Sequence, residues 1–169
     1  YVSHSVSEVA RLAERVVLMR DGKVAAVGTA GEILAGRSRS AADRREAGSV
    51  LSGSIASIDA ATGLATVRLA GASLLVPEAG LHPGKAVRLL VPERDVMIAT
   101  IEPVGLSALN VLRGRVVSID EDETRTVLVR MSCGGDQISA RITSYSAGRL
   151  KLAVGQEVFA VIKSVALER

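Results

Sequence analysis

An internal repeat is the feature that most constrains how this chain can fold. The residues Leu-Ser-Gly at 51–53 and Ser-Ile-Asp at 57–59 recur as Leu-Arg-Gly at 112–114 and Ser-Ile-Asp at 118–120. The offset is 61 residues (114 minus 53). Because a repeated sequence pattern indicates a repeated structural unit, we expect two similarly folded units in the C-terminal part of the chain.

A later motif extends the repeat. Pro-Gly-Lys-x-Val around Gly84 matches Val-Gly-Gln-x-Val around Gly155, 71 residues later (155 minus 84), so the second unit is ten residues longer (71 minus 61). Runs such as 54–58, 65–69 and 86–91 alternate in polarity, which is the period of a strand with one buried face. Several short strands with glycine-rich turns favour a small closed barrel. We predict a mainly β fold with two such barrels in tandem; the alternative is that the repeats are halves of one sandwich.

The first 35 residues carry a different pattern. Ser and Glu have the spacing of a capping box at 5–8, which predicts the start of a short helix. The β-type runs 15–20 and 23–28 flank Asp21-Gly22, a strong signal for a tight hairpin. A second short helix is expected over 29–34. This segment therefore reads as a small α/β unit.

The segment between these parts is rich in arginine and has glycine at both ends. A charged run with few large apolar groups is typical of a solvated connector. We therefore divide the chain into an α/β segment at 1–35, a linker at 36–48, a first barrel at 49–106 and a second barrel at 107–169.

Composition excludes several classes of function. The net charge is +3, but the basic residues form no long stripe, and the aromatic residues are only Tyr1, Tyr145 and Phe159. A single-strand nucleic-acid binder stacks bases on aromatic platforms, so we expect no nucleic-acid partner. The single Cys133 cannot form an internal disulfide, which indicates a reduced, cytosolic setting. No run approaches the roughly 20 apolar residues of a membrane-spanning helix.

Motifs for catalysis and metal binding are also missing. The segment 80–86 contains Gly and Lys, but it lacks the spacing and the hydroxyl of a phosphate-binding loop. The acidic run 120–123 lacks the alternating ligands of an EF-hand, and we expect it to be a solvated hairpin turn. The two histidines and one cysteine lie far apart in sequence, so we expect no metal site.

The first residues resemble the last segment of an ATP-binding cassette ATPase. The resemblance rests on Tyr-Val-Ser-His-Ser at 1–5 and on LAERVVLMRDGKVAAVGTAGEIL at 12–34. It implies that His4 contacts the γ-phosphate of ATP in the full-length subunit, where it serves the catalytic cycle. It also implies that ATP and Mg²⁺ bind upstream of Tyr1, so this part of the chain is not expected to be catalytic alone. From the residues themselves, a histidine that caps a local turn is the alternative.

The second repeat resembles the molybdate-binding "Mop" type of transport-associated oligonucleotide-binding (TOBE) domain. The motifs are SALNVLxG at 107–114, ARITSYS at 140–146, LxLxxG at 150–155 and VIKS at 161–164, in the expected order. In the first repeat, Val-Pro-Glu-Arg-Asp-Val at 91–96 resembles the closing strand of such domains. The resemblance implies OB-like barrels in a di-Mop arrangement, with the anion at the interface of two domains and with paired subunits.

An oxyanion such as molybdate or tungstate presents only acceptors, so its site must supply donors. The motifs contain hydroxyls, one amide and one ammonium group of this kind, with the amide able to donate or to brace a loop. The alternative is that the hydroxyls only cap turns. The family usually has arginine in the place of Leu109, so this chain lacks that charged donor. The candidate oxyanion-binding residues are Ser107, Asn110, Thr143, Ser146, Lys163 and Ser164.

Together these patterns predict the C-terminal regulatory, oxyanion-sensing region of the ATP-binding subunit of a molybdate importer. We expect a homodimer that works with transmembrane permease subunits, in the cytoplasm and peripheral on the inner face of the cell membrane. One alternative is a dimerisation and regulatory domain of an importer for another substrate, such as sugars or sulfate. The other is an intracellular molybdate-storage protein.

Overall fold

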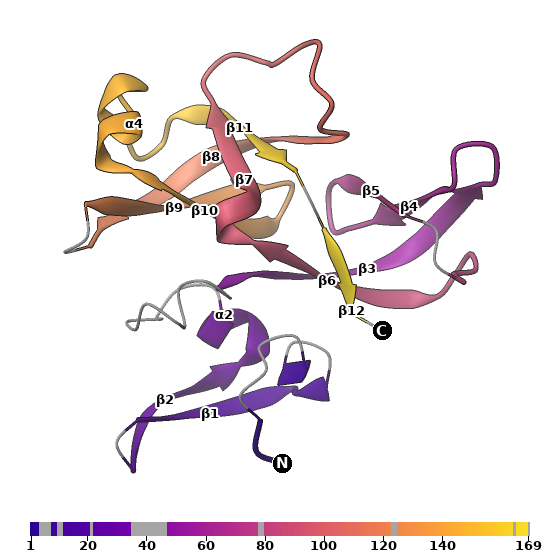
Figure 1. The fold of residues 1–169 in the computed structure, drawn as a ribbon, viewed down its shortest axis with the longest axis horizontal. Coiled ribbons are helices and arrows are strands. Elements are labelled where there is room, and N and C mark those ends of the chain that lie inside the picture. Colours follow the sequence, from indigo (N-terminus) through magenta and orange to yellow (C-terminus); the bar gives the residue numbers. More distant parts are fainter. Residues whose placement is uncertain are drawn as a thin grey trace.

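The fold is built almost entirely of antiparallel strands (Figure 1). The structure is a computed structural model. It describes residues 1–3, 8, 9, 12–20, 22–34, 47–77, 80–122, 125–163 and 165–168. Most of the predicted linker at 36–48 and most of the first predicted helix therefore lie outside the described residues.

The N-terminal part forms the predicted hairpin and helix. Strands β1 (Arg15–Arg20) and β2 (Lys23–Thr29) pair antiparallel and are followed by α2 (Ala30–Leu34). The helix begins at a capping box, because Thr29 N donates to Glu32 Oε2 at 2.8 Å and Glu32 N donates to Thr29 Oγ1 at 3.2 Å. The hairpin and second helix predicted from the sequence are thus confirmed.

The first repeat forms a curled five-stranded sheet. Its central strand β3 bends at a bulge between Ile55 and Ser57, and such a bulge increases the local twist that curls a sheet. Across the sheet, the order is β12 (Ala166–Glu168), β6 (Ala86–Pro92), β3 (Gly48–Asp59), β4 (Leu64–Arg68) and β5 (Ser73–Pro77).

The second repeat forms a matching five-stranded sheet. Its central strand β8 has its bulge between Val116 and Ser118, at the position equivalent to the bulge in β3. The order is β10 (Asp136–Thr143), β9 (Thr126–Cys133), β8 (Asn110–Glu121), β11 (Glu157–Ile162) and β7 (Val96–Ala99). The repeat found in the sequence is therefore a structural repeat.

The two sheets exchange their last strands. The 3-10 turn η1 (Glu93–Asp95) follows β6 and directs β7 into the second sheet, where β7 pairs with β11. In return, β12 leaves the second repeat and pairs with β6 of the first sheet. Figure 1 shows both crossings between the two sheets. Our division of the chain at residue 106 stays a prediction, and each sheet contains one strand from across it.

Equivalent glycines explain the repeated Leu-x-Gly motif. A Cβ at Gly53 would lie 2.5 Å from Arg68 O, and a Cβ at Gly114 would lie 2.8 Å from Ser132 O. Both glycines are on the central strand, where the neighbouring strand passes too closely for a side chain. The repeat thus preserves a packing requirement of each curled sheet.

Apolar side chains from both sheets form one buried cluster, which includes Leu51 and Val67 of the first repeat and Met131 and Ile138 of the second. The predicted fold class, mainly β with two similar barrel-like units, is confirmed, and the two units are curled half-barrel sheets. Among the described residues, no helix has the length and apolar character needed to cross a membrane.

Candidate functional site

The turn after β10 presents two hydroxyl groups side by side. Thr143 ends β10, and its Oγ1 accepts a hydrogen bond of 3.1 Å from the backbone N of Ser146, at the start of α4 (Ser144–Arg149). The Thr143 and Ser146 hydroxyl oxygens are 2.9 Å apart and form a hydrogen bond in which either can be the donor. Thr143 is exposed. The sequence prediction that these two residues act together is consistent with their direct contact.

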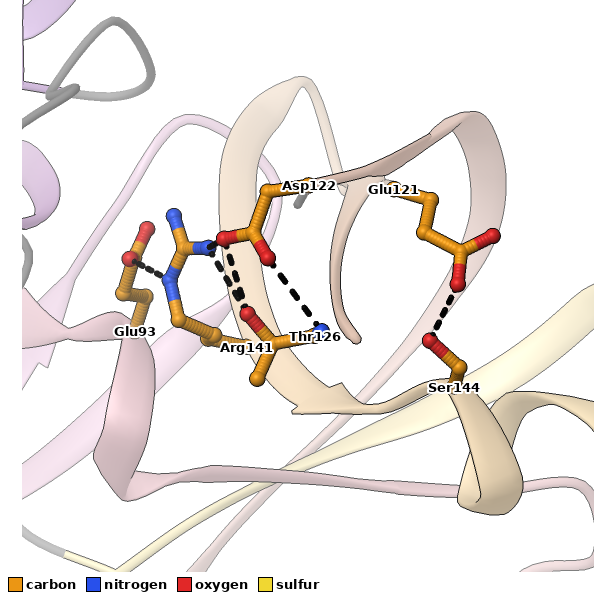
Figure 2. A network of polar contacts seen from close by, with 6 residues as sticks. All are labelled: Glu93, Glu121, Asp122, Thr126, Arg141 and Ser144. Atoms are coloured by element: carbon orange, nitrogen blue, oxygen red, sulfur yellow. Dashed lines mark hydrogen bonds and ion pairs between the residues drawn. The ribbon is translucent and has the colours of Figure 1, made fainter. Parts of the chain in front are cut away.

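The β8–β9 connection anchors this turn. Ser144 N donates to Arg125 O at 3.0 Å, and Ser144 Oγ donates to Glu121 Oε1 at 2.5 Å. Figure 2 shows the Ser144–Glu121 contact beside a larger polar network. The turn is therefore held by contacts to the end of β8, which leaves the hydroxyls of Thr143 and Ser146 directed at each other.

Asn110 braces the two sheets against each other. Its Oδ1 accepts from Leu75 N at 2.7 Å and its Nδ2 donates to Leu75 O at 2.9 Å, and the residue is only 8% exposed. Ser49, 61 residues earlier, makes the equivalent contact, because its Oγ accepts from Ser139 N at 2.9 Å. A side chain from each repeat thus forms hydrogen bonds with backbone groups on the edge strand of the other repeat's sheet. Of the two roles that the sequence allowed for Asn110, this geometry supports the brace.

Lys163 lies directly after β11. It is next to the N-terminal end of β8, whereas the Thr143–Ser146 turn is next to the C-terminal end. Its backbone N donates to Asp95 O at 2.9 Å, and Ile162 before it pairs with Asn110. The Lys163 side chain is exposed and forms no ion pair with any residue that the structure describes.

The remaining candidates lie in the β7–β8 connection or outside the described part. Ser107 is exposed in the connection between β7 and β8, and Leu109 in the same connection is 58% exposed. His4 and Ser164 lie outside the described residues. At position 109, where the resembling domains usually have arginine, this chain thus has an exposed aliphatic side chain.

Within one chain, the candidate residues form two separate groups. Thr143 pairs with Thr126, next to the residue that pairs with Glu121 at the C-terminal end of β8. Asn110 begins the same 12-residue strand. At about 3.3 Å per residue, the two ends of β8 are on the order of 30 Å apart along the strand. Thr143 and Ser146 therefore do not share a small ligand with Lys163 of the same chain.

A partly buried charged network was missed by the sequence analysis. Arg141 Nε contacts Glu93 Oε1, and Arg141 Nη1 lies 3.0 Å from Asp122 Oδ2 (Figure 2). Thr126 Oγ1 donates to the same Asp122 oxygen at 2.9 Å. The acidic run 120–123 lies at the β8–β9 hairpin, where Asp120 and Glu121 are exposed as predicted and residue 123 is outside the described residues. Asp122 differs from the prediction, because its side chain is 25% exposed and forms an ion pair with Arg141.

Glu93 is the most buried member of this network, at 1% exposed. Burial raises its pKa above the usual range, and the hydrogen bond and charge of Arg141 oppose that shift. Oε2 of Glu93 has no hydrogen-bond partner in the described part of the chain. The sequence signal was a Glu-Arg-Asp interruption after an apolar strand, which we interpreted only as a family motif.

Metal chemistry has no support in the described ranges, where no group of three or more His, Cys, Asp or Glu residues is placed to hold an ion. The single cysteine, Cys133, is buried, and burial raises its pKa to about 11. A thiol with a raised pKa is a poor ligand and a poor nucleophile.

Comparison with known proteins shows what this chain is similar to. Residues 106–168 match the TOBE domain model. The chain is 54% identical over 168 residues to the molybdenum import ATP-binding protein ModC of Rhizobium johnstonii, covering 99% of this chain and 47% of that protein. It is 45% identical over 170 residues to ModC of Pseudomonas aeruginosa, again covering 99% and 47%. The chain thus spans about half the length of these relatives.

The fold also matches a solved structure. The cytoplasmic molybdate-binding protein ModG, in a form with molybdate bound, superposes with a TM-score of 0.61 at 26% identity, covering 70% of this chain and 94% of ModG. The matched relatives, the domain match and the shared architecture agree with each other. Residues 106–168 are thus similar to the TOBE domain, and almost the whole chain is similar to a region that spans about half of the molybdenum import ATP-binding proteins.

Proposed function

We propose that this chain is the regulatory region of an importer's ATP-binding subunit and that it binds molybdate or tungstate between two copies. The ModC relatives carry molybdenum import in their names, and ModG is a molybdate-binding protein with this fold. The observation that carries the proposal is the exposed hydroxyl pair of Thr143 and Ser146, whose oxygens lie 2.9 Å apart.

The available side chains suit a doubly charged oxyanion. The hydroxyls of Thr143 and Ser146 can each donate a hydrogen bond to a ligand when the one that donates to its partner rotates toward the ligand. Lys163 supplies a positive charge that the described residues leave unpaired. An anion held by such donors needs few full charges once water is excluded.

Two copies are needed because the donors are divided between the two ends of β8. A two-fold pairing would bring the Thr143–Ser146 turn of one copy against the Lys163 end of the other, and it would create two identical sites. Ser107 and Ser164 would join the Lys163 group. Asn110 would brace that group, since both ends of its amide already contact Leu75.

Anion binding would regulate transport by favouring one arrangement of the paired subunits. The ligand must bind that arrangement more tightly than the other for any regulation to occur. In the whole protein, the ATPase part would hydrolyse ATP with Mg²⁺, with His4 near the γ-phosphate. The subunit would act with transmembrane permease subunits, peripheral on the inner face of the membrane.

Isothermal titration of the chain with molybdate, tungstate and sulfate tests the proposal. We expect heat with the first two anions and much less with sulfate. Thr143→Ala and Lys163→Ala should each weaken binding about tenfold or more, which corresponds to losing one charge-assisted hydrogen bond. Lys85→Ala is the matched control, because Lys85 is also an exposed lysine but lies outside the site. Equal weakening by Lys85→Ala would show that only net charge matters.

A mixing experiment tests whether the site is shared between copies. Thr143→Ala and Lys163→Ala proteins should each bind poorly alone. If they are unfolded and refolded together, half of the dimers are mixed, and each mixed dimer has one intact site. Binding capacity should therefore return to about a quarter of the wild-type value. No recovery, although mixed dimers form, would place the site within a single copy.

A second candidate function is a dimerisation module of an importer for another substrate. Large aliphatic side chains in the β7–β8 connection are exposed, including Ile101 at 80% and Val104 at 87%. Such exposed groups are typical of a contact surface. A stable dimer that gives no heat with any of the three anions would favour this function.

A further inference from the structure

Two bridges connect β10 to the residues where the chain enters the barrels. Ser139 N on β10 donates to Ser49 Oγ at 2.9 Å, and both residues are buried. Two residues further along β10, Arg141 contacts Glu93, whose backbone N donates to Ala47 O at 3.0 Å. Residues 47–49 are thus connected to one strand through two separate polar contacts.

The same strand, β10, ends at Thr143, the first residue of the Thr143–Ser146 turn. Arg141 precedes Thr143 by two residues, so both side chains lie on one face of β10. Arg141 also holds Asp122, which caps Thr126 through contacts of 2.9 Å and 3.2 Å. This places Arg141 between the β8–β9 connection, which anchors the turn, and the buried Glu93 (Figure 2).

Residues at the start of β3 also face the N-terminal part of the chain. A pocket of about 550 Å³ lies between Thr29 and Glu32 on one side and Ser49 and Gln137 on the other. A displacement of residues 47–49 would therefore change the wall that α2 faces. Polar contacts therefore run from the strand that ends at Thr143 to residues 47–49, and α2 lies next to the strand β3 that begins there.

We propose that Glu93 and Arg141 are positioning residues that couple occupancy of the Thr143–Ser146 turn to the entry segment at residues 47–51. This inference rests on the proposed function, because it needs an anion at that turn. The ligand would fix the end of β10, and the Arg141–Glu93 contact would transmit that restraint to Ala47.

The Arg141–Glu93 ion pair suits this role because not all of its polar atoms have a hydrogen-bond partner among the described residues. Arg141 is shared between Glu93 and Asp122, while the buried Oε2 of Glu93 has no partner among the described residues. A buried pair with an unsatisfied oxygen depends strongly on its geometry. A small shift of β10 would change how Arg141 divides its contacts between the two carboxylates. Burial of Glu93 and its raised pKa are consistent with such a sensitive position.

Hydrogen exchange of the full chain with and without molybdate tests the coupling. In the wild type, molybdate should slow exchange about threefold or more in peptides covering residues 29–34 and 47–51, because ligand binding suppresses local opening. Glu93→Gln and Arg141→Met should still bind molybdate within about tenfold of the wild type but should lose this protection. Arg113→Met is the matched control, since it breaks the exposed ion pair with Glu157.

Further variants separate coupling from a loss of folding. Arg141→Lys keeps the charge and should recover more of the protection than Arg141→Met does. Loss of the whole fold would instead speed exchange in β6 and β11 without ligand. Full protection at residues 47–51 in a folded Glu93→Gln protein that binds molybdate would overturn the coupling. Absence of molybdate binding by the wild type would overturn the proposed function, and the coupling with it.

Discussion

The amide of Asn110 offers the sharpest test of how the two repeats stabilise each other. Asn110→Ala removes two hydrogen bonds, of 2.7 Å and 2.9 Å, to the backbone of Leu75 on the edge strand β5. Because the edge strand has no further strand beside it, these groups of Leu75 have no replacement in the sheet. The variant therefore leaves a donor and an acceptor unpaired in a partly buried position.

The expected magnitude follows from that count. Each lost hydrogen bond contributes about 1 kcal/mol net, and each partly buried group left unpaired adds about 0.5–1 kcal/mol when water reaches it. We expect Asn110→Ala to lower the free energy of unfolding by about 3–4 kcal/mol. Ser49→Ala, its equivalent in the first repeat, removes one bond to the fully buried Ser139 N, so about 2 kcal/mol is expected.

Urea unfolding followed by far-UV circular dichroism measures both values, since the chain has no tryptophan to report by fluorescence. Ser107→Ala is the control, because Ser107 is exposed. It should change the free energy of unfolding by less than about 0.5 kcal/mol. If Asn110→Ala were no more destabilising than Ser107→Ala, the reciprocal bracing of the edge strands would contribute nothing, and our account of inter-repeat stability would be refuted.

Three further measurements test other parts of the structure. Gly71→Ala should destabilise the fold by at least about 2 kcal/mol, because its Cβ would lie 2.2 Å from Gly134 O, whereas Gly148→Ala meets no atom within 4 Å and should be neutral or slightly stabilising. Cys133 should react with a thiol reagent at pH 8 far more slowly in the folded than in the urea-unfolded protein, because burial raises its pKa to about 11. Burial also raises the pKa of Glu93, so the folded state holds this proton more tightly than the unfolded state. Stability should therefore fall as the pH rises from the ordinary carboxyl range through the raised value, and Glu93→Gln should show a flatter profile there; parallel profiles would contradict this assignment.

Much of the fold could be predicted from periodicity and repetition. The repeated Leu-x-Gly motif located β3 and β8, and the hairpin at Asp21-Gly22 followed from local turn chemistry. The exchange of β7 and β12 could not be predicted, because sequence patterns give the strands but not which sheet each joins. Strand pairing depends on long-range packing that no local motif records.

The types of residue in the candidate site could be predicted from the sequence, but their positions relative to one another could not. Residue chemistry and family motifs identified Thr143 and Ser146, which the structure brings into contact. The same reasoning grouped them with Lys163, which lies at the other end of β8, because sequence order does not reveal how a barrel distributes its strand ends. The Arg141–Glu93 pair was missed because an alternating charged residue on a strand usually faces solvent.

The strand exchange has a consequence for fragments of this protein. Cleavage in the β7–β8 connection would leave β7 on the first fragment and β12 on the second, so each fragment would lack the strand that completes its own sheet. Neither fragment could complete its own sheet, and each would carry the strand that completes the sheet of the other. Two such halves should reassociate when mixed, and a half kept by itself should borrow the missing strand from its neighbours and form chains of swapped molecules.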